Sequence, residues 1–222
     1  MPWDLADAEI RVLGCLMEKQ RTTPDAYPLT LNSLRLACNQ STARDPVVAY
    51  DDDIVRAALH RLERRGLARL TSGAGSRAAK FRHRLPDTLP MDEAEQAVMC
   101  VLMLRGPQTP GELKQRGERM HPFADLEEVQ ATLDRLIGRE LAQSMARRPG
   151  QKEQRYAHRL GVVDDHQEPA PETEPQRTRD AGTREAGTQE PAAPASGELQ
   201  LLAARVAALE RAVAELRDAL GG

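Results

Sequence analysis

The sequence predicts a mainly α-helical (α+β) protein whose core is one small unit built twice. Two observations lead to this fold class. Matching blocks of residues recur in the same order along the chain, which indicates an internal duplication. Phe, Trp and Tyr make up only 3% of the 222 residues, and this disfavours a β-sandwich, which relies on aromatic and β-branched side chains. The length suits one large domain or two small ones.

The duplication is carried by four pairs of blocks. They are Ala8–Met17 with Ala94–Met103, Thr30–Leu34 with Thr109–Leu113, Val55–Ala68 with Val129–Ala142, and Phe81–Leu85 with Tyr156–Leu160. Chance does not produce four matched blocks in one order. We therefore predict two copies of one domain, over residues 1–86 and 87–162.

Each copy opens with apolar residues at helical spacing, over about residues 6–19 in the first copy and 92–104 in the second. A second, short helix is expected to begin at Thr30 and at Thr109. The sequence Thr-Pro-Gly-Glu from Thr109 onwards combines an N-cap, a proline at the first helical position and a capping box. The connection before this helix is seven residues longer in the first copy. We expect Pro24 and Pro28 to hold that connection extended.

The third helix is predicted to begin in Asp51-Asp52-Asp53 in the first copy and at Asp125 in the second. In the first copy its apolar residues, expected to face inward, are Ile54, Val55, Leu59 and Leu62. Two short extended segments follow, at 68–71 and 79–84 in the first copy and at 141–146 and 154–159 in the second. Three helices followed by a hairpin are the plan of the winged helix-turn-helix domain.

The C-terminal part has a different composition. Residues 163–197 hold too few apolar side chains to offset the entropy of ordering, so we predict a disordered acidic linker. Residues 198–222 predict an amphipathic helix whose spacing favours a parallel coiled coil, and hence a homodimer. The alternative is a helix that docks on its own chain. The predicted dimerisation residues are Leu202, Val206, Leu209, Val213 and Leu216.

Charge and cysteine usage bear on location. The acidic N-terminus lacks a basic start followed by an apolar stretch, so we expect no signal peptide. No apolar run reaches the roughly 20 residues that span a bilayer, and we expect no membrane partner. Three cysteines without CxxC spacing indicate reduced thiols in a cytoplasmic protein. The net charge of −3 is uneven, because residues 1–86 carry +4 and residues 161–222 carry −6.

Several segments also carry a family resemblance. They are EKQ at 18–20, TTPDAYPLTLN at 22–32, ACNQ at 37–40, RDPV at 44–47, VLMLRGPQTPGEL at 101–113 and RPGQKEQRY at 148–156. Over roughly residues 5–160 the chain closely resembles the YceH family of bacterial proteins. The resemblance implies two tandem winged-helix domains in a cytosolic bacterial protein, and it implies no established biochemical role.

The residues do not predict an enzyme. Cys38 has no histidine near it in sequence, and Cys15 and Cys100 lie within apolar helical patterns, where cysteine is usually a small buried hydrophobe. The histidines, at positions 60, 83, 121, 158 and 166, show no HxxxH spacing, and no phosphate-binding glycine motif occurs. We therefore expect no catalytic residue, metal site or cofactor.

Binding to double-stranded DNA is the function that we favour. The third helix and the following wing of the first copy are rich in basic residues, which would neutralise phosphates. The candidate nucleic-acid-binding residues are Arg56, His60, Arg61, Arg64, Arg77, Lys80 and Arg82, with Arg69 and Arg84 also in the wing. Candidates in the loops for a specific contact are Tyr27, Asn39 and Gln40. Against DNA, the acidic run at 51–53 lies at the helix end that usually enters the groove.

The second copy is a weaker candidate, because its third helix presents Glu127, Glu128 and Asp134. We expect it to pack on the first copy or on a partner protein. Two functions therefore remain open: a dimeric, transcription-regulator-like protein that binds DNA through its first domain, and a protein-interaction scaffold built from winged-helix domains without direct DNA readout. A continuous positive face over the third helix and wing would favour the first, and apolar patches or acidic cover would favour the second.

Overall fold

A computed structural model describes residues 3–71, 79–146 and 153–161, and it shows an α+β chain. The first half contains α1 (Asp7–Thr22), a 3₁₀ turn η1 (Pro24–Ala26), β1 (Leu29–Thr30), α2 (Leu31–Cys38), α3 (Asp52–Arg64), β2 (Ala68–Thr71) and β3 (Lys80–His83). The second half contains α4 (Leu85–Thr88), α5 (Glu93–Arg105), α6 (Pro110–Gly117), α7 (Leu126–Gly138), β4 (Ala142–Ser144) and β5 (Tyr156–His158).

The predicted helix starts agree with the structure. The side chains of Thr30 and Thr109 accept hydrogen bonds from backbone N–H groups in the first turns of α2 and α6. Asp51 and Asp125 cap α3 and α7 in the same way. Each cap satisfies one of the N–H groups that a helix start leaves without a partner.

The sheets repeat the same register in both halves. In the first half the strand order is β1-β3-β2, with Leu29 opposite Phe81 and Ala68 opposite His83. In the second half Ala142 lies opposite His158, and the place of β1 is taken by a single bridge between Gln108 and Tyr156. The aligned sequence positions therefore occupy the same sites, as the duplication predicts.

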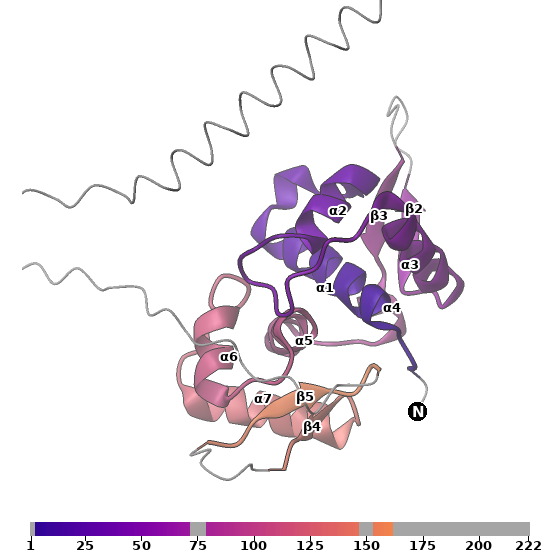
Figure 1. Ribbon diagram of the computed structural model, residues 1–222. Helices are drawn as coiled ribbons and strands as arrows, with labels where there is room; N and C mark the ends of the chain where they lie inside the picture. The colour runs from indigo at the N-terminus through magenta and orange to yellow at the C-terminus, as the bar shows by residue number, and fades with distance from the viewer. Residues whose placement is uncertain (1–2, 72–78, 147–152, 162–222) are drawn as a thin grey trace, which may run out of the picture. The chain divides into compact units, whose positions relative to one another are not determined.

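The two halves meet where α1 packs against α5 (Figure 1). Gly14 allows this close approach, because a Cβ atom there would lie 2.9 Å from a methyl carbon of Leu104. The Cys100 thiol donates to the backbone oxygen of Gly14 at 3.4 Å. Gly14 and Cys100 are equivalent in the 86-residue repeat, so the helices cross where equivalent residues touch. A second link joins the chain near its start to the segment just after β5, since the Leu5 N–H donates to Leu160 O at 2.9 Å.

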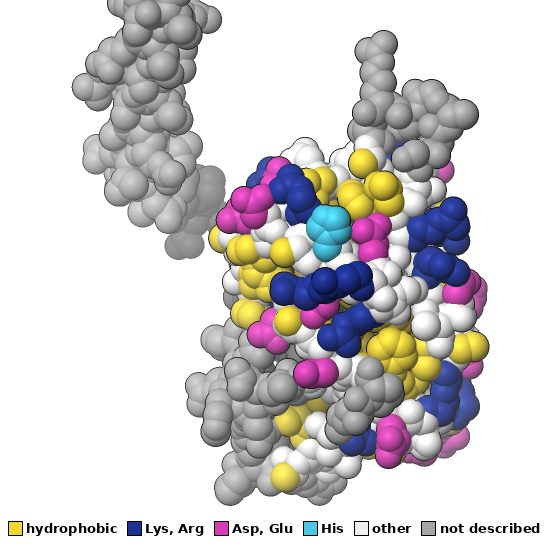
Figure 2. Space-filling model, turned by 90° about the vertical axis from the view of Figure 1, so that its right-hand side faces the viewer, with side chains coloured by type: hydrophobic (Ala, Val, Ile, Leu, Met, Phe, Trp, Pro, Cys, Tyr) yellow, Lys and Arg dark blue, Asp and Glu magenta, His cyan; other side chains and the backbone are white. Residues whose placement is uncertain are grey.

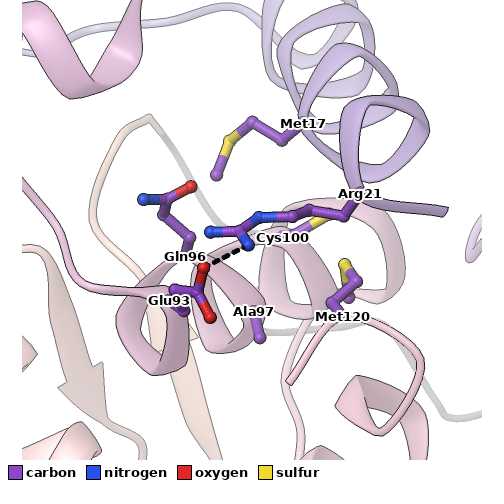
Figure 3. Close-up of a pocket in the computed structure, with 7 residues that line it drawn as sticks. All are labelled: Met17, Arg21, Glu93, Gln96, Ala97, Cys100 and Met120. Carbon is purple, nitrogen blue, oxygen red and sulfur yellow. Dashed lines mark hydrogen bonds and ion pairs between the residues drawn. The ribbon is translucent and has the colours of Figure 1, made fainter. Parts of the chain in front are cut away.

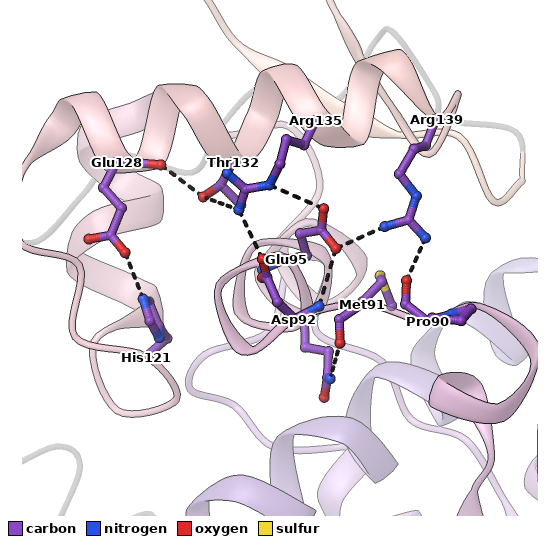
Figure 4. Close-up of polar contacts among 10 residues, drawn as sticks. Pro90, Met91, Asp92, Glu95, His121, Glu128, Thr132, Arg135 and Arg139 are labelled. Atoms are coloured by element: carbon purple, nitrogen blue, oxygen red, sulfur yellow. Dashed lines mark hydrogen bonds and ion pairs between the residues drawn. The ribbon is translucent and has the colours of Figure 1, made fainter.

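A duplicated clamp ties the third helix of each half to the first, and Figure 4 shows the clamp of the second half. In the second half, buried Glu95 of α5 accepts a hydrogen bond from Arg139 at 2.8 Å and lies 3.4 Å from Arg135. Glu9 of α1 occupies the equivalent place in the first half and lies 3.9 Å from Arg61 and 3.8 Å from Arg65. The clamp of the first half is looser, because one Glu9 oxygen is buried without a hydrogen-bond partner.

Two local predictions were wrong. Ile54 is 39% exposed and does not face inward, because it lies in the first turn of α3, next to the loop that precedes the helix. Pro24 does not hold the chain extended but begins the 3₁₀ turn η1, since its fixed φ also suits a helical first position. The predicted linker and coiled-coil residues, including Leu202, Val206, Leu209, Val213 and Leu216, lie outside the described residues.

Candidate nucleic-acid interface

The exposed side of α3 carries charges of both signs. Figure 2 views the side of the molecule that bears α3, β2 and β3, and Lys and Arg side chains are interspersed there with acidic and hydrophobic ones. Arg56 pairs with Asp53 at 2.5 Å, and Arg61 is directed to Glu9. His60 is exposed and lies 3.8 Å from Glu63. Most of the predicted α3 cations therefore lie close to a carboxylate of the same chain. Arg64 is exposed.

The paired strands β2 and β3 hold a different arrangement. Arg69 and Arg82 lie directly opposite each other, and the pair Thr71 and Lys80 is two residues further along. Because side chains alternate between the faces of a strand, these four side chains share one face of the sheet. Arg69 and Arg82 are exposed. Within the part of the chain that the structure describes, no carboxylate forms an ion pair with Arg69, Lys80 or Arg82. Arg77 lies outside the described residues.

The second half lacks this arrangement at the same positions. Gln143 and Ala157 stand opposite each other where the first half has Arg69 and Arg82. Arg155, the counterpart of Lys80, forms two hydrogen bonds with Glu112, at 3.0 and 3.2 Å. In the first half Ser33 stands where the second half has Glu112. At these described positions, the opposed arginine pair is therefore found in the first half and not in the second.

Two like charges directly opposite each other in a sheet destabilise it. The fold does not need the Arg69–Arg82 pair, because the β4–β5 hairpin forms with neutral residues there. An anion placed between two guanidinium groups would relieve their repulsion and accept several hydrogen bonds. We name the exposed face formed by Arg69, Thr71, Lys80 and Arg82 the basic sheet face. Sequence reasoning counted these cations, but only the strand register shows that they share a face.

The three loop candidates all make contacts within the chain. The Tyr27 hydroxyl accepts a hydrogen bond from the His83 N–H at 2.8 Å, and burial raises the pKa of Tyr27 to about 12. The Asn39 side chain bonds both the N–H and the carbonyl oxygen of Tyr50, at 2.9 and 2.8 Å. Gln40 accepts from buried Arg44 at 2.9 Å. Each of these side chains therefore holds a loop in place, and a recognition role for them stays a prediction.

A small pocket lies between the two halves (Figure 3). Its lining residues are Met17, Arg21, Glu93, Gln96, Ala97, Cys100 and Met120. Arg21 of α1 and Glu93 of α5 form an ion pair there at 2.6 Å. The cavity of about 10 Å³ has room for about one water molecule, and so it is too small for a substrate. Among the described residues, no group of three or more His, Cys, Asp or Glu side chains is placed to hold a metal ion.

Comparison with known proteins places the chain in a family. Residues 5–151 match the family model described as "Protein of unknown function, DUF480". The chain belongs to this family. The DUF480 match covers the elements from α1 to β4 and so includes the basic sheet face.

Relatives of this DUF480 protein extend the match along the chain. A "UPF0502 protein" of Pelobacter propionicus is 53% identical over 159 residues, which are 71% of this chain and 72% of that protein. A "UPF0502 protein" of Solibacter usitatus is 44% identical over 220 residues, 99% of this chain and 96% of that protein. The "UPF0502 protein YceH" of Escherichia fergusonii is 42% identical over 228 residues, with the same two coverages. The resemblance to the YceH family is thereby confirmed.

No helix of the described chain is both long and apolar enough to cross a membrane.

Proposed function

We propose that this protein consists of two tandem winged-helix domains and that the first binds the phosphate backbone of double-stranded DNA through its basic sheet face. The observation that carries the proposal is the directly opposed pair Arg69 and Arg82. The repulsion in this pair has no counterpart in the second half, where a similar hairpin forms without it. Guanidinium groups bind phosphates, like carboxylates, in a bidentate manner.

In this proposal the basic sheet face, rather than α3, makes most of the contacts with DNA. Arg56 and Arg61 of α3 are directed to acidic groups of the chain, and Asp51, Asp52 and Asp53 stand at the start of that helix. Contacts to phosphate position a protein on the duplex without reading its sequence. We therefore propose a cytoplasmic, transcription-regulator-like protein whose first domain binds the phosphate backbone of DNA. Its C-terminal residues 198–222 would join two chains into a dimer.

The test measures binding of a labelled, mixed-sequence duplex by fluorescence anisotropy across a range of salt concentrations. The logarithm of the binding constant falls with the logarithm of the salt concentration, and each lost phosphate contact should make this slope less steep by about 0.9. We expect this reduction for Arg69→Gln and for Arg82→Ala, which install the residues of the second half. The matched control is Arg119→Gln, which removes one exposed positive charge from the second half.

Equal binding by Arg69→Gln and Arg119→Gln would overturn the assignment to the basic sheet face. Failure of the unaltered protein to bind duplex at low salt would overturn DNA binding itself and favour the interaction scaffold. Deletion of residues 198–222 should convert a dimer into a monomer in light scattering, and an unchanged number of chains per particle would refute this role of the C-terminal residues.

A further inference from the structure

The pocket between the two halves is lined by three sulfur-bearing side chains. They are Met17 of α1, Cys100 of α5 and Met120 of the segment between α6 and α7. Figure 3 shows the three side chains at the pocket, each from a different one of these segments. Met17 and Cys100 are buried, and Met120 is partly buried against the same core. The fold thus brings together one thiol and two thioethers that are distant in the sequence.

The chemistry of this donor set favours a soft metal ion. Thiolate and thioether sulfur atoms are the ligands by which proteins select Cu(I). The Cys100 thiol donates to the backbone oxygen of Gly14 at 3.4 Å, which leaves the lone pairs of its sulfur for an ion. The cavity of about 10 Å³ holds about one particle of the size of water, so a single ion fits and a small organic molecule does not.

The charges at the pocket favour a monovalent ion over a divalent one. Arg21 and Glu93 form an ion pair at 2.6 Å there, so their charges balance each other. A monovalent ion bound to a Cys100 thiolate and two neutral thioethers adds no net charge. A divalent ion with the same ligands would leave a buried positive charge without a partner, and such a charge is costly. Cu(I) therefore suits the pocket better than Zn(II).

The same ion pair marks the way into the pocket. The side chains of Arg21 and Glu93 are 30% and 66% exposed. Ion pairs in contact with water contribute little to stability, so these two side chains can separate at low cost. An ion can therefore reach the sulfur atoms from the solvent without unfolding of either half.

The internal repeat shows that the shared fold does not need sulfur at position 100. Gly14 of α1 is the counterpart of Cys100 in the 86-residue repeat, and it has no side chain. The counterpart of Met17 is Met103, which is buried but does not line the pocket. The two positions share the role of packing α1 on α5, and Cys100 adds a metal ligand to it.

The connections before the third helices also differ between the halves. This connection covers residues 39–51 in the first half and the shorter range 118–125 in the second. Arg11, the counterpart of the pocket residue Ala97, donates to the backbone oxygen of Pro46 in the longer connection at 2.6 Å. The longer connection therefore covers the place in the first half that is equivalent to the pocket, whereas the shorter one leaves the pocket open.

We propose that Met17, Cys100 and Met120 form a binding site for a single Cu(I) ion. When the ion binds, a bond forms between copper and the Cys100 sulfur, the S–H bond breaks and the thiol proton passes to water. No electron is transferred in this step. The bound ion links α1 and α5 to the segment that precedes α7, and so it ties the two halves of the chain together.

The test titrates the full-length protein with Cu(I) in the absence of oxygen, in competition with the coloured chelator bathocuproine disulfonate. We expect the unaltered protein to take up a single equivalent. Cys100→Ser, Met17→Leu and Met120→Leu should each weaken binding by at least about tenfold, the lower end of the loss seen when even a group behind a metal ligand is removed. Leucine has nearly the volume of methionine, so the Met variants should remain folded, and circular dichroism checks this.

Two matched controls come from the chain itself. Met103→Leu removes the counterpart of Met17, and Cys15→Ala with Cys38→Ala leaves Cys100 as the remaining cysteine. Both controls should bind Cu(I) as the unaltered protein does.

A direct readout does not depend on variants. In the unaltered protein with ¹³C-labelled methionine methyl groups, Cu(I) should shift the NMR signals of Met17 and Met120 and leave that of Met103 in place. X-ray absorption at the copper edge should show sulfur neighbours only.

Several outcomes would overturn the proposal. They are failure to take Cu(I) from the chelator, equal affinity in Cys100→Ser and the unaltered protein, and equal losses in Met17→Leu and Met103→Leu. Tighter binding of Zn(II) than of Cu(I) would overturn the assignment to a soft monovalent ion. The assay contains no DNA, so its outcome is independent of the function proposed above.

Discussion

The two clamps are chemically alike but geometrically different, and this allows a matched test. Glu95→Gln keeps an oxygen that can accept from the backbone N–H of Asp92, but it loses the charge that holds Arg139 at 2.8 Å. A hydrogen bond between charged groups contributes about 1.5–3 kcal/mol. The side chain of Arg139 is 35% exposed, so water reduces this value. We expect Glu95→Gln to lower the free energy of unfolding by about 1–2 kcal/mol.

Glu9→Gln should cost much less. The nearest arginine nitrogens lie 3.8 and 3.9 Å from one Glu9 oxygen, and that oxygen has no hydrogen bond to lose. We expect a loss below about 0.5 kcal/mol, as for weak pairs with exposed arginines. Urea unfolding followed by circular dichroism measures both variants, and the melting temperature should fall by about 3–6 °C for Glu95→Gln. Equal losses in the two variants would refute the reasoning that the shorter contact is the stronger one.

Three further predictions concern packing, pH and the buried arginine. Gly14→Ala should destabilise the protein by about 1–3 kcal/mol through overpacking against α5. Gly138→Ala is the control, because there is open space around its Cβ position. Equal midpoints of urea unfolding for the two variants would contradict this. Burial lowers the pKa of His83 and of His158 to about 4, below the ordinary value of 6.5. Stability is thus fully present above pH 6.5 and falls towards pH 4, by about 2 kcal/mol per histidine at pH 5. His83→Gln should flatten this decline in the urea midpoint, and an unchanged slope would show that His83 does not cause it. Arg44→Met should cost about 3–5 kcal/mol because Glu18 loses both hydrogen bonds from Arg44. A smaller loss in thermal denaturation would show that Lys19, which lies 3.2 Å from Glu18, or water compensates the carboxylate.

Much of the fold was predictable because local signals and the repeat agreed. Thr30, Thr109, Asp51 and Asp125 are helix caps whose chemistry is local, and the structure shows each of them in that role. The repeat then allowed an element that is clearly marked in one copy to be predicted at the equivalent, less clearly marked position of the other copy. Such agreement between local preference and the whole fold is typical of natural sequences.

The roles of polar side chains were harder to predict because they depend on contacts distant in sequence. Tyr27 bonds His83, 56 residues away, and Arg44 bonds Glu18, 26 residues away. Asn39 was predicted as a candidate for binding a ligand, but its side chain donates a hydrogen bond to the backbone oxygen of Tyr50. Arg61 was predicted to bind DNA, but in the structure it points to Glu9. Its counterpart Arg135 points to Glu95 in the same way, so both arginines belong to the repeated clamp. Composition shows that a cation is present, but only the tertiary structure shows what it faces.

The duplication separates residues needed for folding from residues that serve another purpose. The clamp glutamates and the buried histidines occur in both halves, so their roles belong to the shared fold. Arg69 and Arg82 occur in one half only, and the other half folds with neutral residues there. Since unrelieved repulsion lowers stability, replacing Arg69 with Gln should leave the protein as stable or more stable while it weakens duplex binding. A gain in stability with a loss of binding would identify a site that is maintained for a ligand at some cost to the fold. A loss of both would mean that Arg69 supports the hairpin itself.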